Sequence, residues 1–265
     1  MPSSTITAST LGLIGFGAFG RLGARHLQPH VALRVFDPAE AVAPDATGKG
    51  LRAASLAEIG ACNIVVLAVP VDAMAAVLVE LRPHLRADAI VLDVGSVKLG
   101  PAATMLALLP ETVTIVGTHP LFGPQSARHG IAGLKVALCP LRGEGAWRIG
   151  AFLRRVLKLD VVLTTPDEHD REVALAQGLT HLIAKILVQM EPLPRRMTTA
   201  SFDLLMRATE MVRHDAPGVF LAIERANPHA RAVRDRFFAL ADEMRAHLDG
   251  GAEATLDQRP AETVL

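Results

Sequence analysis

The segment LGLIGFGAFG at residues 11–20 joins a short apolar run to a glycine-rich turn. The run from Leu11 to Gly15 has the length and composition of a buried strand. The turn fits the pattern G-x-G-x-x-G, in which Gly15 permits a tight turn, Gly17 lets the backbone approach a pyrophosphate and Gly20 lets helix and strand pack closely. The free N–H groups of the following helix would face the anion. The segment therefore predicts a strand, a turn and a helix arranged around a phosphate.

Asp37 strengthens this interpretation because it ends the second apolar run, twenty residues after Gly17. A carboxylate at that place accepts hydrogen bonds from an adenosine ribose. The alternative is that the glycines serve turn geometry only and that Asp37 is a surface acid. With strand, helix and acid in register, we expect a dinucleotide site. Its candidate residues are Gly15, Phe16, Gly17, Ala18, Phe19, Gly20, Asp37, Val69 and Pro70.

Asp37 also favours NAD over NADP as the cofactor. A carboxylate there would repel a 2′-phosphate, and no arginine follows it between Pro38 and Pro44. A later basic residue, Lys49 or Arg52, could still fold back toward a phosphate, so NADP is the less favoured alternative.

Short apolar runs separated by helix-length segments continue to about residue 165. Such runs are typical of strands buried on both faces and joined by crossover helices. We expect strands at 11–15, 31–36, 63–69, 89–94, 113–117, 134–138 and 161–163, and helices over 71–85 and 144–159. The pattern predicts an α/β fold, with a doubly wound (Rossmann) parallel sheet forming a dinucleotide-binding domain over residues 11–165.

After Pro166 the apolar residues recur at helical spacing. One stripe comprises Leu175, Leu179, Leu182, Ile183, Ile186 and Met190, and a second comprises Val233, Phe237, Leu240, Ala241, Met244 and Leu248. The prolines of EPLP at 191–194 should end the first long helix. We expect an all-helical substrate and dimerisation domain over 166–250, a flexible N-terminus at 1–10 and a disordered tail at 251–265.

The two apolar stripes are broader than a small appendage can bury against one face of a sheet. We therefore expect a C2 homodimer in which the helical halves of two chains pack together. One compact monomer is the alternative.

Composition narrows the partners. The 265 residues carry 27 basic and 27 acidic side chains, so no basic excess favours nucleic acid or an anionic membrane surface. No apolar stretch is long enough for a membrane helix and no signal peptide is recognisable, which predicts a cytoplasmic protein. Cys62 and Cys139 lie in apolar runs and are expected to be buried thiols, with no metal site.

Two segments should end at the same edge of the sheet: DVGSVK at 93–98 and THPLFGP at 118–124. Ligands bind at the carboxyl edge of such sheets, so Ser96 and His119 could share one pocket. Histidine accepts a proton near neutral pH, which makes His119 the candidate catalytic base. The alternatives are a strand-end histidine bonded to backbone, and a serine that only caps a helix beginning near Val97.

In the helical half, Gln177, His181 and Lys185 form a line opposite the first stripe. This line forms either a wall of the substrate cleft or a solvated face. His169 and Asp170 are expected to set up the start of this helix, since an acid in the first turn complements the helix dipole.

These motifs together resemble the prephenate and arogenate dehydrogenases of tyrosine biosynthesis. The resemblance is carried by the glycine turn, DVGSVK, HPLFGP at 119–124, His169-Asp170 and His181. Thr118 to Pro120 and the stretch 202–230, with Leu205, Asp215 and Asn227, are most similar to the plant-type arogenate branch.

The resemblance implies NAD-dependent oxidative decarboxylation of a cyclohexadienol. His119 would take the hydroxyl proton, Ser96 would hydrogen-bond the hydroxyl or hold the histidine, and His181 would contact the substrate side chain. Bacterial relatives clamp a substrate carboxylate with a helical-domain arginine, but here Met211 aligns near that position, and Arg207 and Arg213 are its neighbours. Gln125 stands where an acid is common in the family.

Two other functions stay open at this point. A 3-hydroxyacid or imine dehydrogenase shares the two-domain plan and relies on a helical lysine, for which Lys185 is the candidate. A non-catalytic NAD sensor would bind the dinucleotide without turnover. Whether prephenate or arogenate is preferred depends on whether the pocket offers the substrate a donor or an acceptor.

Overall fold

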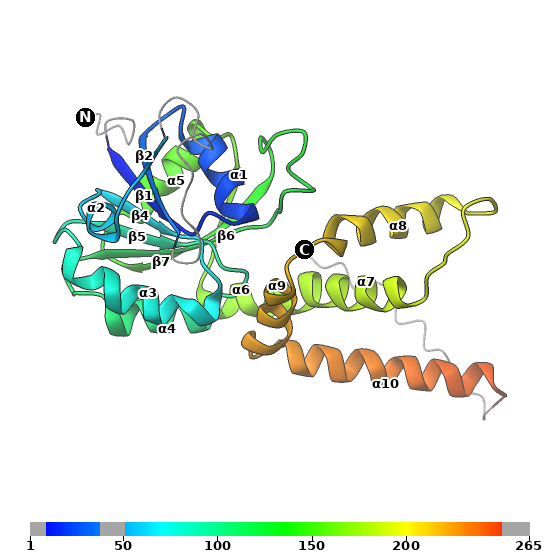
Figure 1. Cartoon of the computed structure of the whole chain (residues 1–265). Helices are drawn as coiled ribbons and strands as arrows, with labels where there is room; N and C mark the ends of the chain where they lie inside the picture. The colour runs from blue at the N-terminus through cyan, green and yellow to red at the C-terminus, as the bar shows by residue number, and fades with distance from the viewer. Residues whose placement is uncertain (1–8, 38–50, 251–265) are drawn as a thin grey trace.

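A computed structural model describes residues 9–37 and 51–250 of the chain. The expectations for residues 1–8, for the tail at 251–265 and for Lys49 lie outside the described residues. Figure 1 shows a sheet with helices on both faces, followed by a purely helical region. The predicted fold class is confirmed.

The sheet has eight strands in the order β3-β2-β1-β4-β5-β6-β7-β8. Their bounds are β1 (Thr10–Ile14), β2 (Ala32–Phe36), β3 (Leu51–Ala53), β4 (Ile64–Leu67), β5 (Ile90–Asp93), β6 (Thr114–Pro120), β7 (Lys135–Arg142) and β8 (Asp160–Leu163). β6 continues three residues beyond the predicted end of that strand, so His119 lies within the sheet and not after it.

One part of the predicted parallel sheet is wrong. β7 runs antiparallel to β6, with His119 opposite Ala137, and β8 runs parallel to β7. A parallel return needs a crossover connection, usually a helix, and residues 121–134 between β6 and β7 form no helix. The apolar pattern of β7 suits parallel and antiparallel pairing equally well, so the sequence alone does not reveal its orientation.

Helices cover both faces of the sheet, and each face has its own apolar core. One face carries α1 (Ala18–Leu27) and α5 (Ala146–Arg155); the other carries α2 (Leu56–Gly60), α3 (Met74–Leu81) and α4 (Leu99–Leu108). The short 3₁₀ turns η3 (Val71–Ala73) and η4 (Arg82–His84) flank α3. Because strand residues point alternately to the two faces, Leu13 packs under α1 while Ile14 belongs to the opposite core.

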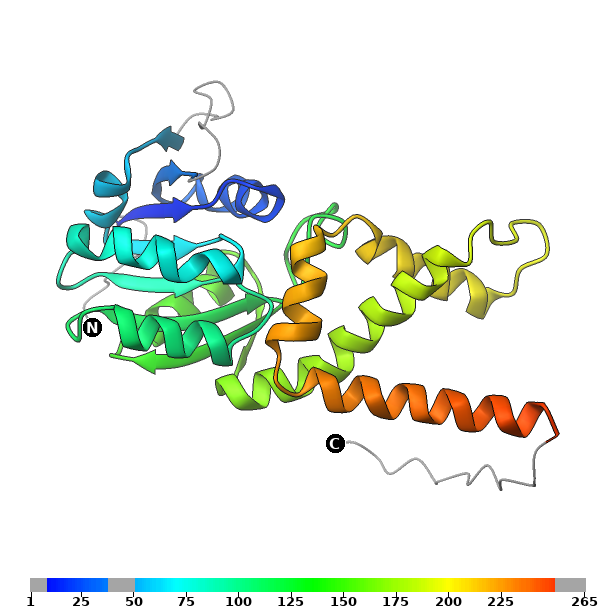
Figure 2. The same ribbon diagram turned by 60° about the horizontal axis from the view of Figure 1, so that its bottom comes forward.

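The helical region follows β8 directly. Its elements are α6 (Pro166–Val173), the π-helical turn η5 (Ala174–Gly178), α7 (Leu179–Gln189), α8 (Ala200–Arg213), α9 (Pro217–Leu221), the π-helical turn η6 (Ala222–Ala226) and α10 (Ala230–Leu248). Figure 2 shows α9 beside the sheet, whereas α7, α8 and α10 extend away from it. No described helix has the length and apolar character that crossing a membrane requires.

Candidate active site

The glycine turn between β1 and α1 has the backbone geometry that its sequence predicts. Gly15 has a φ of 97°, in the left-handed region, and a Cβ there would overlap the carbonyl of Ala68. A Cβ on Gly20 would overlap the carbonyl oxygen of Gly15. A Cβ on Gly17, by contrast, would meet nothing within 4 Å. Two glycines thus close the turn, and Gly17 leaves space above it.

The N-terminus of α1 is free for an anion. Gly17 is its N-cap, no side chain of the described residues caps it, and its first turn has no acidic residue. Uncapped N–H groups and the helix dipole at such an end attract negative charge. Val69 and Pro70 follow β4 beside this turn, Val69 buried and Pro70 exposed.

Asp37 follows β2 and faces the glycine turn, where its Oδ2 accepts the N–H of Phe16 at 2.6 Å. The guanidinium of Arg21 lies 4.8 Å from the centroid of the Phe16 ring. Arg52, the basic residue that could have folded back, instead pairs with Glu58 at 2.6 Å. Asp37 therefore stands directly after the second strand, as the sequence predicts, with its carboxylate against the glycine turn.

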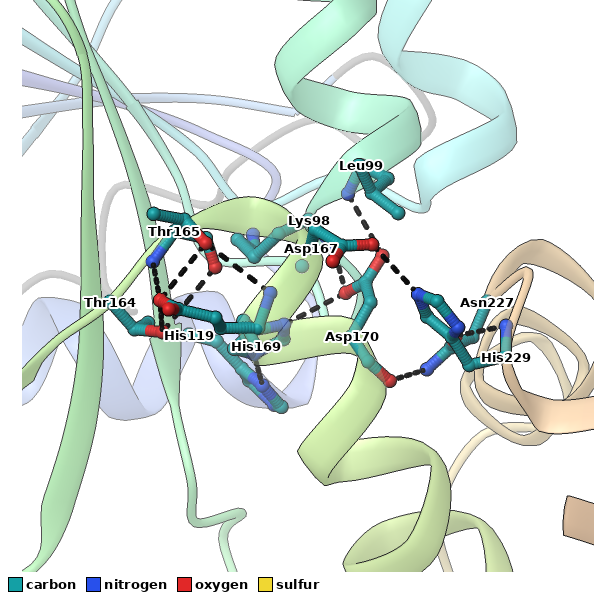
Figure 3. A network of polar contacts seen from close by, with 12 residues as sticks. Lys98, Leu99, His119, Thr164, Thr165, Asp167, His169, Asp170, Asn227 and His229 are labelled. Carbon is teal, nitrogen blue, oxygen red and sulfur yellow. Dashed lines mark hydrogen bonds and ion pairs between the residues drawn. The ribbon is translucent and has the colours of Figure 1, made fainter.

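His119 is 3% exposed, and its Nδ1 lies 2.8 Å from Nε2 of His169 on α6. The Nδ1 of His169 lies 2.8 Å from Oδ1 of Asp170. Figure 3 shows His119 beside His169 and Asp170, the last two carried by α6. The structure thus brings His169, which the sequence placed only at a helix start, into direct contact with the candidate base.

Asp170 also caps a helix that lies 72 residues earlier in the chain. Its Oδ1 accepts the N–H of Lys98 at 2.7 Å and its Oδ2 accepts the N–H of Leu99 at 2.9 Å. The helix α4 begins at Leu99, so the alternative reading of Ser96 as its N-cap is wrong. The expectation for the start of α6 is also wrong, because Thr165 and Glu168 form the capping box there.

The hydrogen-bond pattern assigns the protons on both rings. A carboxylate accepts only, so the Nδ1 of His169 donates to Asp170 and the Nε2 of neutral His169 carries a lone pair. That lone pair accepts the Nδ1 proton of His119. The Nε2 of neutral His119, which bonds to no other described residue, is then the basic nitrogen.

The surroundings of His119 keep it neutral. Burial, and then the positive charges that His169 and Lys98 would place nearby, hold the pKa of His119 well below its ordinary value. Lys98 is itself 1% exposed and forms an ion pair with the buried Asp93 at the end of β5. Asp93 Oδ2 also accepts the N–H of Gly95 at 3.0 Å, which shapes the DVGSVK turn.

A second histidine-carboxylate pair lies on the helical side. The Nδ1 of His181 lies 2.9 Å from the carbonyl of Gln177, and its Nε2 lies 3.0 Å from Oδ2 of Asp215. Asp215 Oδ1 would lie 3.9 Å from a Cβ built on Gly123, so this acid faces the turn that follows β6, the strand that carries His119. Both ring nitrogens of His181 face acceptors, which fits a positively charged imidazolium paired with the carboxylate.

His119 and most of the sheet that carries it lie in a segment that resembles a known protein family. Residues 21–165, more than half of the chain, match the model of the prephenate dehydrogenase nucleotide-binding domain. The chain belongs to the prephenate dehydrogenase family. The resemblance inferred from the motifs is confirmed.

Individual relatives agree with the prephenate dehydrogenase assignment. A probable arogenate/prephenate dehydrogenase of Methanocaldococcus jannaschii is 25% identical over 69% of this chain and 43% of its own length. The chloroplastic arogenate dehydrogenase 1 of Arabidopsis thaliana is 28% identical over 63% of this chain and 28% of its own length. The chain thus spans less than half of either relative.

The fold agrees as well. A crystal structure of prephenate dehydrogenase from Aquifex aeolicus superposes with a TM-score of 0.69 at 20% identity, covering 91% of this chain and 90% of that one. At this identity the likeness concerns the fold alone.

Four candidate residues of the prephenate dehydrogenase resemblance are not drawn into these contacts. Ser96 is half-buried at the sheet edge and hydrogen-bonds to no other described residue, and Gln125 is exposed. Arg207 is exposed and donates to the carbonyl of Asp203 on its own helix at 3.3 Å. Arg213 pairs with Glu191 and with Glu210. Their roles stay predictions.

Three polar residues of the site were missed or only partly recognised from the sequence. The motif DVGSVK gives no role to Lys98, and the sequence pattern assigns Asp170 to the wrong helix. Asn227 donates to the carbonyl of Asp170 at 2.7 Å and accepts the N–H of His229, which holds the acid in place. Lys98 carries a sequence signal, because it follows the apolar stretch VLDVGSV and a polar residue buried there requires a partner. Asp170 and Asn227 lie in polar stretches, which give no such signal.

Proposed function

We propose that this chain is an NAD-dependent dehydrogenase that oxidatively decarboxylates prephenate or arogenate, yielding tyrosine or its keto-acid precursor. The observation that carries the proposal is His119: a neutral, buried imidazole whose Nε2 is left basic by His169 and Asp170. Family membership and the glycine turn support the same reading.

The residues of the turn fit a dinucleotide. Gly17 leaves open the space that a pyrophosphate needs, the N-terminus of α1 lacks a competing cap, and Asp37 stands where the ribose would lie. The acid disfavours a 2′-phosphate, so NAD is the preferred cofactor. The related Aquifex aeolicus structure is described as a complex with hydroxyphenyl propionate and NAD+, which supports this choice.

The chain's residues then need to do little chemistry. Bound NAD supplies the acceptor for the hydride of the substrate's carbinol carbon. His119 Nε2 takes the proton of the hydroxyl on that carbon, and the ring carboxylate departs as carbon dioxide because its electrons restore aromaticity. The contributions of the protein are therefore a positioned base and orientation of the ring.

The His181–Asp215 pair favours arogenate over prephenate. Arogenate carries an ammonium and a carboxylate on its side chain, which complement the carboxylate of Asp215 and the imidazolium of His181. Prephenate carries a ketone in place of the ammonium, and a ketone offers nothing to an acceptor. A site built around an acceptor discriminates against a substrate that leaves this acceptor unpaired.

The activity is tested by incubating purified protein with NAD and either substrate. Carbon dioxide release with a matching rise in absorbance at 340 nm is expected. His119→Asn should lower kcat by about 10² to 10⁴ with NAD affinity unchanged. Binding of NAD without turnover of either substrate would support the alternative of an NAD sensor. Turnover of 3-hydroxyacids or imines would instead implicate Lys185, whose Nζ lies 5.9 Å from the Phe220 ring.

Substrate preference is tested by comparing kcat/KM for arogenate and prephenate. Asp215→Asn should lower the ratio of kcat/KM for arogenate to kcat/KM for prephenate by about tenfold or more. This factor corresponds to the loss of one charged hydrogen bond to arogenate. Asp203→Asn, on the exposed face of α8, is the matched control and should leave the ratio unchanged. An unaltered ratio in the Asp215 variant would contradict the assignment.

A second copy of this chain is the partner that the helical region favours. Leu240, Met244 and Leu248 on α10 are 41–76% exposed, as are Leu204 and Met211 on α8 at 61% and 45%. Exposed apolar faces of this kind mark interaction surfaces, and α8 packs against α7, the helix that carries His181. We therefore propose that the chain forms a homodimer through the helical region.

A further inference from the structure

The base and its neighbour differ in how well each can hold a proton. An imidazolium at His119 would be buried beside Lys98, in a site that lowers its pKa, and no carboxylate of the described residues hydrogen-bonds to it. His169, one hydrogen bond away, touches Asp170. The best place for the substrate's proton is therefore not the residue that first receives it.

We propose that the proton taken from the substrate comes to rest on His169, where Asp170 balances its charge, and that His119 passes it on by changing tautomer. The inference rests on the proposed function. It makes His169 and Asp170 positioning residues for the reaction, acting through His119.

The transfer balances bond by bond. The substrate O–H bond breaks as the Nε2–H bond of His119 forms. The Nδ1–H bond of His119 then breaks as the Nε2–H bond of His169 forms, along the existing 2.8 Å contact. His119 ends neutral with its proton on Nε2, and His169 ends as an imidazolium that donates from Nδ1 to Asp170.

Asp170 is held as an anion by the elements around it. Its two oxygens accept the N–H groups of Lys98 and Leu99 at the N-terminus of α4, where the helix dipole stabilises negative charge. Asn227 fixes its backbone from the far side. The carboxylate thus faces His169 with its charge and its orientation both set before substrate arrives.

The other titratable groups near the pair do not compete for the proton. The ammonium of Lys98 is already paired with Asp93. Burial raises the pKa of the Cys139 thiol to about 12, so it stays a neutral thiol. Glu168 on α6 is exposed and its carboxylate is engaged with Thr164 and Thr165. His229, whose N–H is accepted by Asn227, pairs with Asp167 at 2.9 Å.

The decisive variant is His169→Gln. A glutamine can accept the Nδ1 proton of His119 through its amide oxygen but cannot take up a proton itself. We expect kcat to fall by about 10²-fold while NAD affinity is unchanged. The acid limb of the kcat/KM profile should also move to lower pH, by about one unit, because only His119 then titrates. His229→Gln, on the same network but out of contact with His119, should leave kcat and the limb unchanged.

A readout that needs no turnover separates this proposal from the proposed function. In ¹⁵N NMR of the wild-type protein at pH 8, His119 should be protonated at Nδ1 and bare at Nε2. On acidification the first proton should appear on His169, with His119 neutral but now protonated at Nε2. A His119 that becomes doubly protonated while His169 stays neutral would overturn the proposal, as would a His169→Gln enzyme with an unmoved acid limb.

Discussion

At the scale of single residues, the protonation state of His119 links the site to the stability of the fold. Burial lowers its pKa, and a positive charge on His169 or Lys98 lowers it further. A folded chain with such a histidine binds fewer protons than the unfolded chain below about pH 6.5. His119 therefore costs stability in acid, in the pH range below the ordinary histidine pKa.

The free energy of unfolding should consequently fall between about pH 7 and pH 5, with His119 contributing a slope of at most about 1.4 kcal/mol per pH unit. His119→Gln removes this histidine from both states and should flatten the profile by that amount. Chemical denaturation at a series of pH values measures both curves. Parallel curves for wild type and variant would show that His119 titrates normally in the folded protein.

The sequence made part of this site predictable. His119 and its proximity to the sheet edge follow from local pattern, because a strand, a turn and a histidine lie within ten residues. The partners of Asp170 do not follow from local pattern, because the N–H groups that its carboxylate accepts belong to Lys98 and Leu99, about 70 residues earlier in the chain. Only the packing of α6 against the start of α4 brings them together, and no spacing in the sequence encodes that contact.

At the scale of elements, α1 is the clearest case of a helix whose end is left unsatisfied for a ligand. Gly17→Val adds a side chain where nothing lies within 4 Å, so the variant should fold with a loss of about 1 kcal/mol or less from the weaker N-cap. The added side chain occupies the space proposed for the pyrophosphate. NAD affinity, measured by calorimetry, should fall at least about tenfold.

Gly100 provides the control for this change, since it lies in α4 with equally open space around its Cβ position. Gly100→Val should leave NAD affinity unchanged. Equal NAD affinity in the Gly17 variant and the wild type would place the dinucleotide elsewhere and remove the basis of the cofactor assignment.

Element types were more predictable than their directions and junctions. The buried apolar runs located seven of the strands, since burial on both faces leaves a continuous apolar signature. The three-residue β3 and the short α2 are too brief to show periodicity. The sequence also gives no sign of the π-helical turn η5. Its small residues Ala174 and Gly178 are buried in close packing, which becomes evident only in the folded structure.

At the scale of the whole molecule, α10 is a helix of 19 residues with one buried position, Ala230. The apolar stripe that the sequence predicted on it is real, but within the described chain it packs against little beyond its first turns, as Figure 2 shows. A helix of this kind derives most of its stability from a packed apolar face. In the proposed homodimer, a second copy of the chain would supply such a face.

We expect light scattering at micromolar concentration to give about twice the chain mass of 28.2 kDa. Leu240→Asp should shift the protein toward monomer, because a C2 interface contains each position twice. Removing two buried leucines costs about 3 kcal/mol or more, which raises the dissociation constant by at least about 10²-fold. Leu106→Asp is the matched control and should stay dimeric, because Leu106 is 42% exposed, against 52% for Leu240, but lies on α4 against the sheet and not in the helical region. A wild-type mass near that of one chain would leave the face of α10 without the partner argued here.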